Sequence, residues 1–183
     1  MPVKNLIKCF GETAPPEVVR VSRGLMYRDF ITVGVLLKKL KHKDRKGTNS
    51  ANGLYPDNWI YVQERDVRVG RIQIYNNWSP YLVRDPKTVW IGMEYFCSEG
   101  DELWNQPDNK IMKLAIEELV KLELVDQEDV LDSTLIRMLK TYPAYFGTYD
   151  EFHVIRNYTD QFENLFLIGR NGMHSTTIRT IRC

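Results

Sequence analysis

Four apolar runs separated by turn-forming segments constrain the fold of this chain more than any other sequence feature. Residues 31–37 are mainly β-branched and aliphatic, and residues 59–63, 67–75 and 87–97 are rich in aromatic and β-branched side chains. Such residues favour strands. A short polar turn between the second and third runs is typical of a β-hairpin. Strands that follow one another through short turns pair antiparallel, so the sequence predicts a mostly antiparallel sheet.

Helical periodicity predicts helices that flank this sheet. Apolar residues at positions 3, 6, 7 and 10 indicate one helix, and Pro15-Pro16 suits the first turn of a second. Residues 110–122 carry an apolar face, with Asp108 or Asn109 as the expected N-cap. We expect a further strand over residues 133–145 and a helix over 149–161, so the predicted fold class is α+β.

The stretch from residue 164 to 174 ends the recognisable pattern. Residues 165–168 are an unbroken apolar run that stops at a glycine, which predicts a strand buried on both faces followed by a sharp turn. Gly169, Arg170 and Gly172 suit a turn that meets an anion, because glycines expose backbone N–H groups and arginine adds a two-pronged hydrogen bond. An ordinary turn at the end of a strand is the alternative.

The segment Glu-Asn-Leu-Phe-Leu-Ile-Gly-Arg at 163–170 resembles the C-terminal flavin motif of one superfamily. These are the FAD-dependent amine oxidases, protoporphyrinogen oxidases and UDP-galactopyranose mutases. Gly-Arg followed by a second glycine resembles the mutase branch. The segments Tyr-Arg-Asp-Phe at 27–30, Glu-Tyr-Phe at 94–96 and Tyr-Pro at 142–143 resemble the same superfamily. No Gly-x-Gly-x-x-Gly fingerprint occurs, so the resemblance implies a C-terminal fragment that lacks the N-terminal dinucleotide-binding motif.

The resemblance also implies roles for individual residues. It places Gly169, Arg170, Asn171, Gly172 and Met173 at the flavin. It makes Tyr142 and Arg170 substrate contacts, and it identifies no catalytic residue. The implied fold is the substrate-binding domain of an FAD-dependent oxidoreductase plus the last strand of the FAD domain.

Expected boundaries follow from these motifs: a substrate-binding-like domain over 1–162, the terminal FAD-domain strand and loop over 163–174, and a tail over 175–183. After His174 the mutase-like pattern continues Arg-Tyr-Asn-Asn-Gln-Asp-His-Ser-Met, whereas this chain ends Ser-Thr-Thr-Ile-Arg-Thr-Ile-Arg-Cys. The observed residues can be encoded as AGT ACA ACA ATC AGG ACC ATT CGA TGC. One G inserted after the first AG yields codons for the family-like residues. We therefore expect an out-of-frame tail.

Charge and cysteine content narrow the remaining possibilities. A net charge of +1 gives no overall attraction to nucleic acid. The basic segment 38–46 has no interleaved aromatic residues and is interpreted as a solvated turn. Three scattered cysteines, no signal peptide and no long apolar run predict a cytoplasmic protein without a transmembrane segment. No metal site is expected.

Two functional hypotheses follow. The first is the C-terminal, substrate-binding portion of an FAD-dependent oxidoreductase or mutase-like flavoenzyme, with FAD and a small molecule as partners of the parent protein. Such a portion would bind FAD weakly or not at all and would be inactive alone. The second is a non-catalytic binding or assembly domain, or one half of a split flavoprotein, in which unpaired sheet edges favour self-association. The residues do not identify the substrate.

Overall fold

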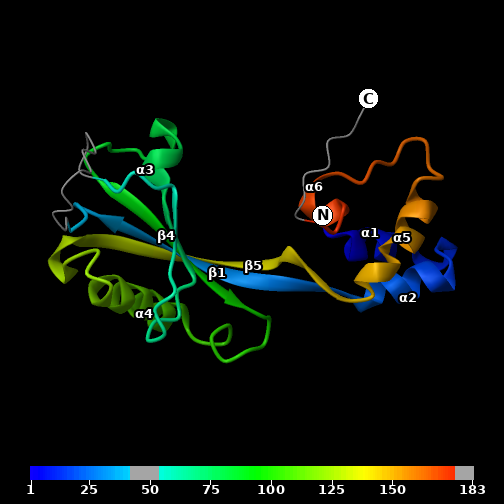
Figure 1. Cartoon of the computed structure of the whole chain (residues 1–183), viewed down its shortest axis with the longest axis horizontal. Coiled ribbons are helices and arrows are strands. Elements are labelled where there is room, and N and C mark those ends of the chain that lie inside the picture. The colour runs from blue at the N-terminus through cyan, green and yellow to red at the C-terminus, as the bar shows by residue number, and fades with distance from the viewer. Residues whose placement is uncertain (42–53, 176–183) are drawn as a thin grey trace. The chain divides into compact units, whose positions relative to one another are not determined.

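The computed structural model of the chain describes residues 1–41 and 54–175 (Figure 1). Its helices are α1 (Val3–Cys9), α2 (Pro16–Gly24), α3 (Tyr75–Trp78), α4 (Asp108–Lys121), α5 (Phe152–Thr159) and α6 (Gly169–Gly172). Its strands are β1 (Leu25–Leu37), β2 (Trp59–Tyr61), β3 (Arg71–Ile74), β4 (Val89–Cys97) and β5 (Val130–Gly147). Among the residues described, no helix combines the length and the apolar character that a membrane crossing requires.

The strands form one sheet in the order β2-β3-β4-β1-β5. β3 pairs antiparallel with β2 on one side and with β4 on the other, so that Ile72 lies opposite Ile60 and Met93. The α+β prediction and the predicted hairpin are therefore confirmed, although β2 and β3 are shorter than the runs that predicted them. β2 and β5 are the edges of this sheet within the described residues.

The chain divides into two compact units. Unit 1 comprises Met1–Asp29 and Leu139–Cys183, and unit 2 comprises Phe30–Met138. Unit 2 is thus one continuous stretch, whereas unit 1 is assembled from both ends of the chain. The boundaries expected after residues 162 and 174 concern a different division, and they stay a prediction.

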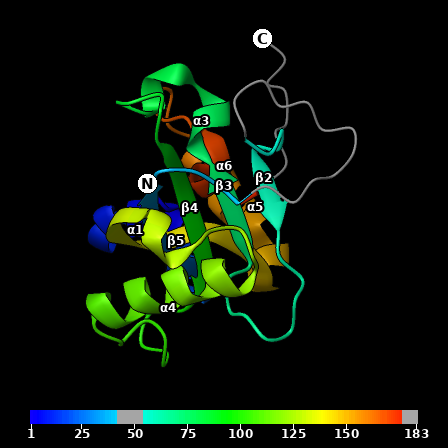
Figure 2. The same ribbon diagram turned by 90° about the vertical axis from the view of Figure 1, so that its left-hand side faces the viewer.

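The core of unit 2 lies between α4 and the sheet. Ile111, Ala115 and Leu119 of α4 are fully buried and belong to the same apolar cluster as Ile72 and Met93. Figure 2 shows α4 running along the sheet. The predicted apolar face of this helix is confirmed.

Glu118 on α4 is a charged residue within this core. Its carboxylate accepts hydrogen bonds from the backbone N–H groups of Arg68 (2.6 Å) and Val69 (3.1 Å) and from the Tyr95 hydroxyl (2.9 Å). Only 5% of Glu118 is exposed. Burial and the Glu118 charge raise the pKa of Tyr95 above its ordinary value, because both disfavour the phenolate. The carboxylate thus joins α4, β4 and the segment before β3.

The core of unit 1 is helical. Its buried members are Val3, Ile7, Ala14, Val18, Val21, Leu25 and Ile155, which come from α1, α2, α5 and the segments beside them. The predicted first helix is confirmed, and Pro16 opens α2 where its missing N–H costs no helical hydrogen bond. The predicted helix at 149–161 appears as a short 3-10 turn followed by α5.

The predicted strand at 165–168 is wrong. These four residues form no strand, and Phe166 and Ile168 are 77% and 69% exposed. Leu167 packs against the core of unit 1. An isolated apolar segment becomes a strand only where a neighbouring strand takes up its backbone hydrogen bonds, and no strand of the described residues pairs with it.

The predicted N-cap of α4 is wrong. Pro107 occupies the N-cap and no side chain caps that end, while Asp108 accepts a hydrogen bond from Nη1 of Arg137 (2.5 Å). Of the basic segment, Lys38 and Lys39 are exposed as expected, and residues 42–46 lie outside the described residues. So do residues 176–183 of the expected tail.

Candidate functional site

The turn that follows residue 168 is built around Gly169. Ile168 is still extended, whereas Gly169 has a φ of +68° and opens the single turn of α6. Space is not what excludes a side chain here, because a Cβ at this position would meet nothing within 4 Å. The left-handed backbone conformation is what favours glycine. The Met173 N–H donates to the Gly169 carbonyl (2.9 Å) and closes the turn.

The structure brings together the two residues predicted to contact substrate. The guanidinium carbon of Arg170 lies 4.5 Å from the centroid of the Tyr142 ring. Tyr142 is half-buried on β5, and Arg170 is exposed. Among the described residues Arg170 has no ion pair, so the N–H groups of its guanidinium remain available to an anion while the tyrosine face holds its plane.

Three further residues predicted at the cofactor follow Arg170 directly in the sequence. Asn171, Gly172 and Met173 are half-buried. The Oδ1 atom of Asn171 is buried and has no hydrogen-bond partner within the structure. A buried carbonyl oxygen without a donor is costly, so this atom is a ready acceptor for a group that enters the site.

His174 is a residue of this site that the sequence analysis did not assign. Its side chain is fully buried, and its ring stacks on Phe152 and meets the edge of Tyr27. Nε2 lies 3.2 Å from the Ala144 carbonyl oxygen, and Nδ1 is buried without a hydrogen-bond partner among the described residues. If Nε2 carries the proton and donates to that carbonyl, Nδ1 is left as an acceptor. Burial lowers the pKa of His174, which favours the neutral ring.

Tyr27 contributes a second buried polar atom beside His174. Its hydroxyl faces the backbone N–H groups of Val3 and Lys4 without a hydrogen bond of ordinary geometry. Burial raises the pKa of this phenol. The signal that could have drawn attention to both residues is their position: one follows the glycine turn directly, and the other begins the Tyr-Arg-Asp-Phe segment.

The aromatic residues of unit 2 divide into two environments. Tyr95 is fully buried, whereas Trp59 and Tyr61 of β2 are 44% and 63% exposed at the sheet edge. Arg71 lies beneath them, with its guanidinium carbon 4.7 Å from the Trp59 ring, and its Nε donates to Glu94 (2.8 Å). This arginine is occupied by an internal carboxylate. The aromatic edge can therefore offer stacking surface, whereas Arg170 of the candidate site has no ion pair within residues 1–41 and 54–175.

The candidate site combines a glycine turn, a guanidinium that lies over an aromatic ring, and buried acceptor atoms without partners among the described residues. The guanidinium can bind an anionic group, and the acceptors Asn171 Oδ1 and His174 Nδ1 can bind a hydrogen-bond donor. Within residues 1–41 and 54–175 no group of three or more His, Cys, Asp or Glu side chains could hold a metal ion. The site's own side chains include no nucleophile paired with a base, so no catalytic residue is assigned.

Comparison with known proteins identifies solved structures with a similar fold. No protein-family model matches the sequence, and no curated protein matches it. The chain is similar to a crystal structure of reduced UDP-galactopyranose mutase, with a TM-score of 0.68 and 17% identity over 94% of this chain and 34% of the other. It is also similar to a protein assigned as a protoporphyrinogen oxidase from Exiguobacterium sp. 255-15, with a TM-score of 0.59, 13% identity, and coverage of 95% and 36%. The chain spans about a third of the length of these structures, and at this identity the likeness concerns the fold.

Proposed function

We propose that this chain is the C-terminal, substrate-binding portion of an FAD-dependent oxidoreductase or of a UDP-galactopyranose mutase-like flavoenzyme. The observation that carries the proposal is the similarity of fold to a mutase over 94% of this chain but only 34% of the mutase. The superfamily motifs in the sequence point to the same enzymes independently. The 183 residues contain no dinucleotide fingerprint, which the remaining part of such an enzyme would supply.

The residues around Gly169 fit a flavin-facing role. The turn offers backbone N–H groups at a glycine. Among the described residues, the carbonyl oxygen of Asn171 has no hydrogen-bond partner and the Arg170 guanidinium has no ion pair. In this proposal Gly169, Asn171, Gly172 and Met173 lie against FAD, and Arg170 with Tyr142 orients an anionic substrate. FAD, when bound, supplies the electron-transfer chemistry, and this chain supplies binding and orientation.

The same proposal predicts that the chain alone holds FAD weakly or not at all and is inactive. FAD titration of the purified chain, followed by flavin absorbance after gel filtration, should leave no flavin on the protein. Co-expression with a partner segment that carries a dinucleotide fingerprint should give a yellow complex. One flavin bound per chain in the absence of any partner would overturn the proposal.

Arg170 provides the sharper test within the yellow complex. Arg170→Ala should weaken binding of a nucleoside diphosphate such as UDP by about tenfold, because one charge-assisted hydrogen-bonding group is lost. Arg156→Ala removes an exposed arginine of α5, elsewhere in unit 1, and is the matched control. Equal UDP affinity in both variants would refute the substrate role of Arg170.

A second candidate is a non-catalytic assembly domain or one half of a split flavoprotein. The specific observation in its favour is the exposure of Phe166 and Ile168, which offers apolar surface to another chain. Sedimentation of the purified chain should then show self-association that Phe166→Asp abolishes. A monomer at all concentrations would exclude self-association. The split flavoprotein would then be the remaining form of this candidate, and the co-expression experiment tests it.

A cytoplasmic location is part of the proposal. Its support is that Cys9 and Cys97 form no disulfide among the described residues, which agrees with a reducing compartment.

A further inference from the structure

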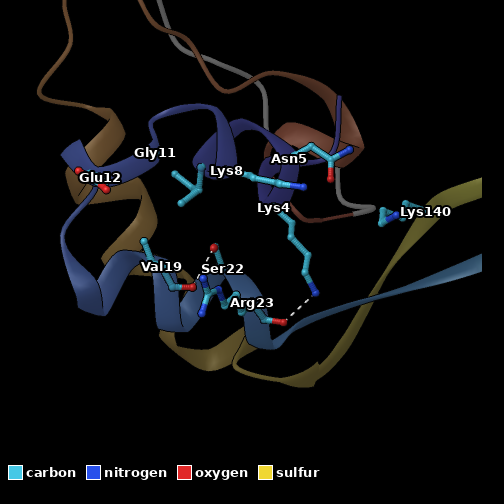
Figure 3. A pocket seen from close by; sticks show the side chains of 10 residues that line it. Lys4, Asn5, Lys8, Gly11, Glu12, Val19, Ser22, Arg23 and Lys140 are labelled. Atoms are coloured by element: carbon cyan, nitrogen blue, oxygen red, sulfur yellow. Dashed lines mark hydrogen bonds between the residues drawn. The ribbon is translucent and has the colours of Figure 1, made fainter.

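A cavity lies in unit 1. Its volume is about 530 Å³, within the range of small-molecule sites. Side chains of α1 and α2 line it together with Lys140 of β5 (Figure 3). None of the residues that line it belongs to the candidate site described above.

The lining of this cavity is basic over an apolar floor. Lys4, Lys8, Arg23 and Lys140 contribute four cations, and Glu12 is the one acid among the ten residues drawn in Figure 3. Ile7 and Val19 are the apolar side chains of the lining. Asn5, Gly11 and Ser22 complete it. Four positive charges against one negative charge leave a net positive cavity that favours an anion.

These cations are not neutralised by neighbouring carboxylates. Within the part of the chain that the structure describes, Lys8, Arg23 and Lys140 form no ion pair. Lys4 is fixed instead by carbonyl groups, because its Nζ donates to the Arg23 oxygen at 2.7 Å and to the Leu25 oxygen at 3.4 Å. Figure 3 shows this side chain reaching from α1 to the end of α2. Positive charge at that end also complements the partial negative charge of the helix C-terminus.

Lys140 reaches the cavity from an unusual backbone conformation. Its φ is +52°, in the left-handed region that non-glycine residues rarely adopt. The buried Asp29 holds this conformation, because its Oδ1 accepts the Lys140 N–H at 2.6 Å. Strained backbone of this kind persists only where its surroundings enforce it, and it occurs often at ligand sites. The bend thus places a cation at the cavity from the middle of a long strand.

We propose that this cavity binds an organic phosphate, with the phosphate held by Lys8, Arg23 and Lys140 and the organic body against Ile7 and Val19. A doubly charged phosphate matches a set of unpaired cations better than a carboxylate does, and the arginine fork suits its oxygens. The apolar floor distinguishes a phosphate ester from inorganic phosphate. The proposal does not depend on flavin binding.

The test is an NMR titration of the full, uniformly labelled chain with phenyl phosphate. Saturable amide shifts are expected at Lys8, Arg23 and Lys140. Phenol and inorganic phosphate should each bind at least tenfold more weakly, because each lacks one half of the ligand. Lys8→Ala and Arg23→Ala should each weaken phenyl phosphate about fivefold, the size expected for a partly exposed charge contact. Lys110→Ala, which removes an exposed lysine of α4, is the matched control and should leave the affinity unchanged.

Each alternative outcome has a distinct meaning. Shifts that gather at Tyr142 and Arg170 would overturn the cavity assignment while supporting the other site. Equal binding of benzoate would overturn the choice of phosphate, and equal binding of phenol would overturn the role of charge. Equal binding of inorganic phosphate would overturn the proposed contact of the organic part of the ligand with Ile7 and Val19. Shifts that do not saturate and that spread over the basic surface would overturn the proposal of a specific site.

Discussion

The buried carboxylate of Glu118 should contribute more to the stability of unit 2 than any exposed charge of that helix. In Glu118→Gln the side chain keeps its shape, and one oxygen can still accept from Val69 and Tyr95. The new NH₂ group must then face the N–H of Arg68, where two donors meet. The substitution therefore isolates the acceptor function and the charge from any change in volume.

The size of the effect follows from the three hydrogen bonds. Two of them change from charge-assisted to neutral, at a cost of about 1 kcal/mol each, and the donor that loses its acceptor costs about another 1 kcal/mol. The free energy of unfolding should fall by about 3 kcal/mol. With a urea m-value of about 2 kcal/mol/M, the unfolding midpoint should move down by about 1.5 M.

Tryptophan fluorescence is a selective assay for this change. The four tryptophans, Trp59, Trp78, Trp90 and Trp104, all lie between Phe30 and Met138, so the signal reports unit 2. Glu117→Gln is the matched control, because Glu117 is exposed and makes a single ion pair with Lys113 at 3.7 Å. That substitution should cost less than about 0.5 kcal/mol. If both variants unfold at the same urea concentration, the stabilising role of Glu118 is refuted.

Three further predictions concern single residues. Because burial lowers the pKa of His174, the unfolded state binds the proton more readily than the folded state does. The stability of unit 1 should therefore be intact above about pH 6.5, the ordinary pKa of histidine, and decline as the pH falls below it. ¹H NMR should show the His174 ring titrating below that ordinary value, and a midpoint at or above it would contradict the burial argument. Gly169→Ala should destabilise the turn by about 1 kcal/mol, because the backbone φ of +68° disfavours alanine although a Cβ would meet no other atom. Hydrogen exchange at the Met173 amide should then rise about fivefold, and unchanged exchange would show that alanine tolerates this backbone. Arg137→Ala removes the donors to the Trp104 and Gln106 carbonyls. Urea titrations should show the free energy of unfolding of unit 2 lowered by about 2 kcal/mol, and a cost equal to that of Lys110→Ala would contradict this.

Local patterns predicted the elements of this chain well wherever the segment finds its partner inside the chain. The apolar face of residues 110–122 identified α4, because a helix satisfies its own backbone and needs only a surface to cover. The alternating runs at 59–63 and 67–75 predicted the β2–β3 hairpin, whose strands are near neighbours in sequence. The length of β5, which continues to Gly147, was underestimated.

The residues at 165–168 show the limit of that reasoning. Their composition is that of a buried strand, yet burial and strand formation depend on neighbouring strands that the sequence of this segment does not contain. The composition of residues 165–168 therefore indicates a buried strand position, but the described residues provide no neighbouring strand at which the segment could take it. The same holds for Asp108, whose preference for a cap was outweighed by Pro107 and by the pairing with Arg137.

The candidate site was only partly accessible to sequence reasoning. The glycine, arginine and tyrosine positions came from short motifs. The structure places Arg170 over the Tyr142 ring, and the substrate role of the two residues stays a prediction. His174 and Tyr27 were not assigned, because their significance lies in burial and in hydrogen-bonding atoms without partners, which only packing reveals. The basic cavity combines residues from positions 4 to 140, and no local pattern could have grouped them.

The division of the chain has a consequence for its synthesis. Unit 2 ends at Met138, so every residue that it needs has been translated before α5 is made. At about 5–20 residues per second, the ribosome takes roughly 1–4 s to reach the end of α5 at Thr159. During this interval α1 and α2 await α5, their partner from the far end of the chain. Their apolar faces, rather than those of the sheet, are then the surfaces that a chaperone would encounter on the nascent chain.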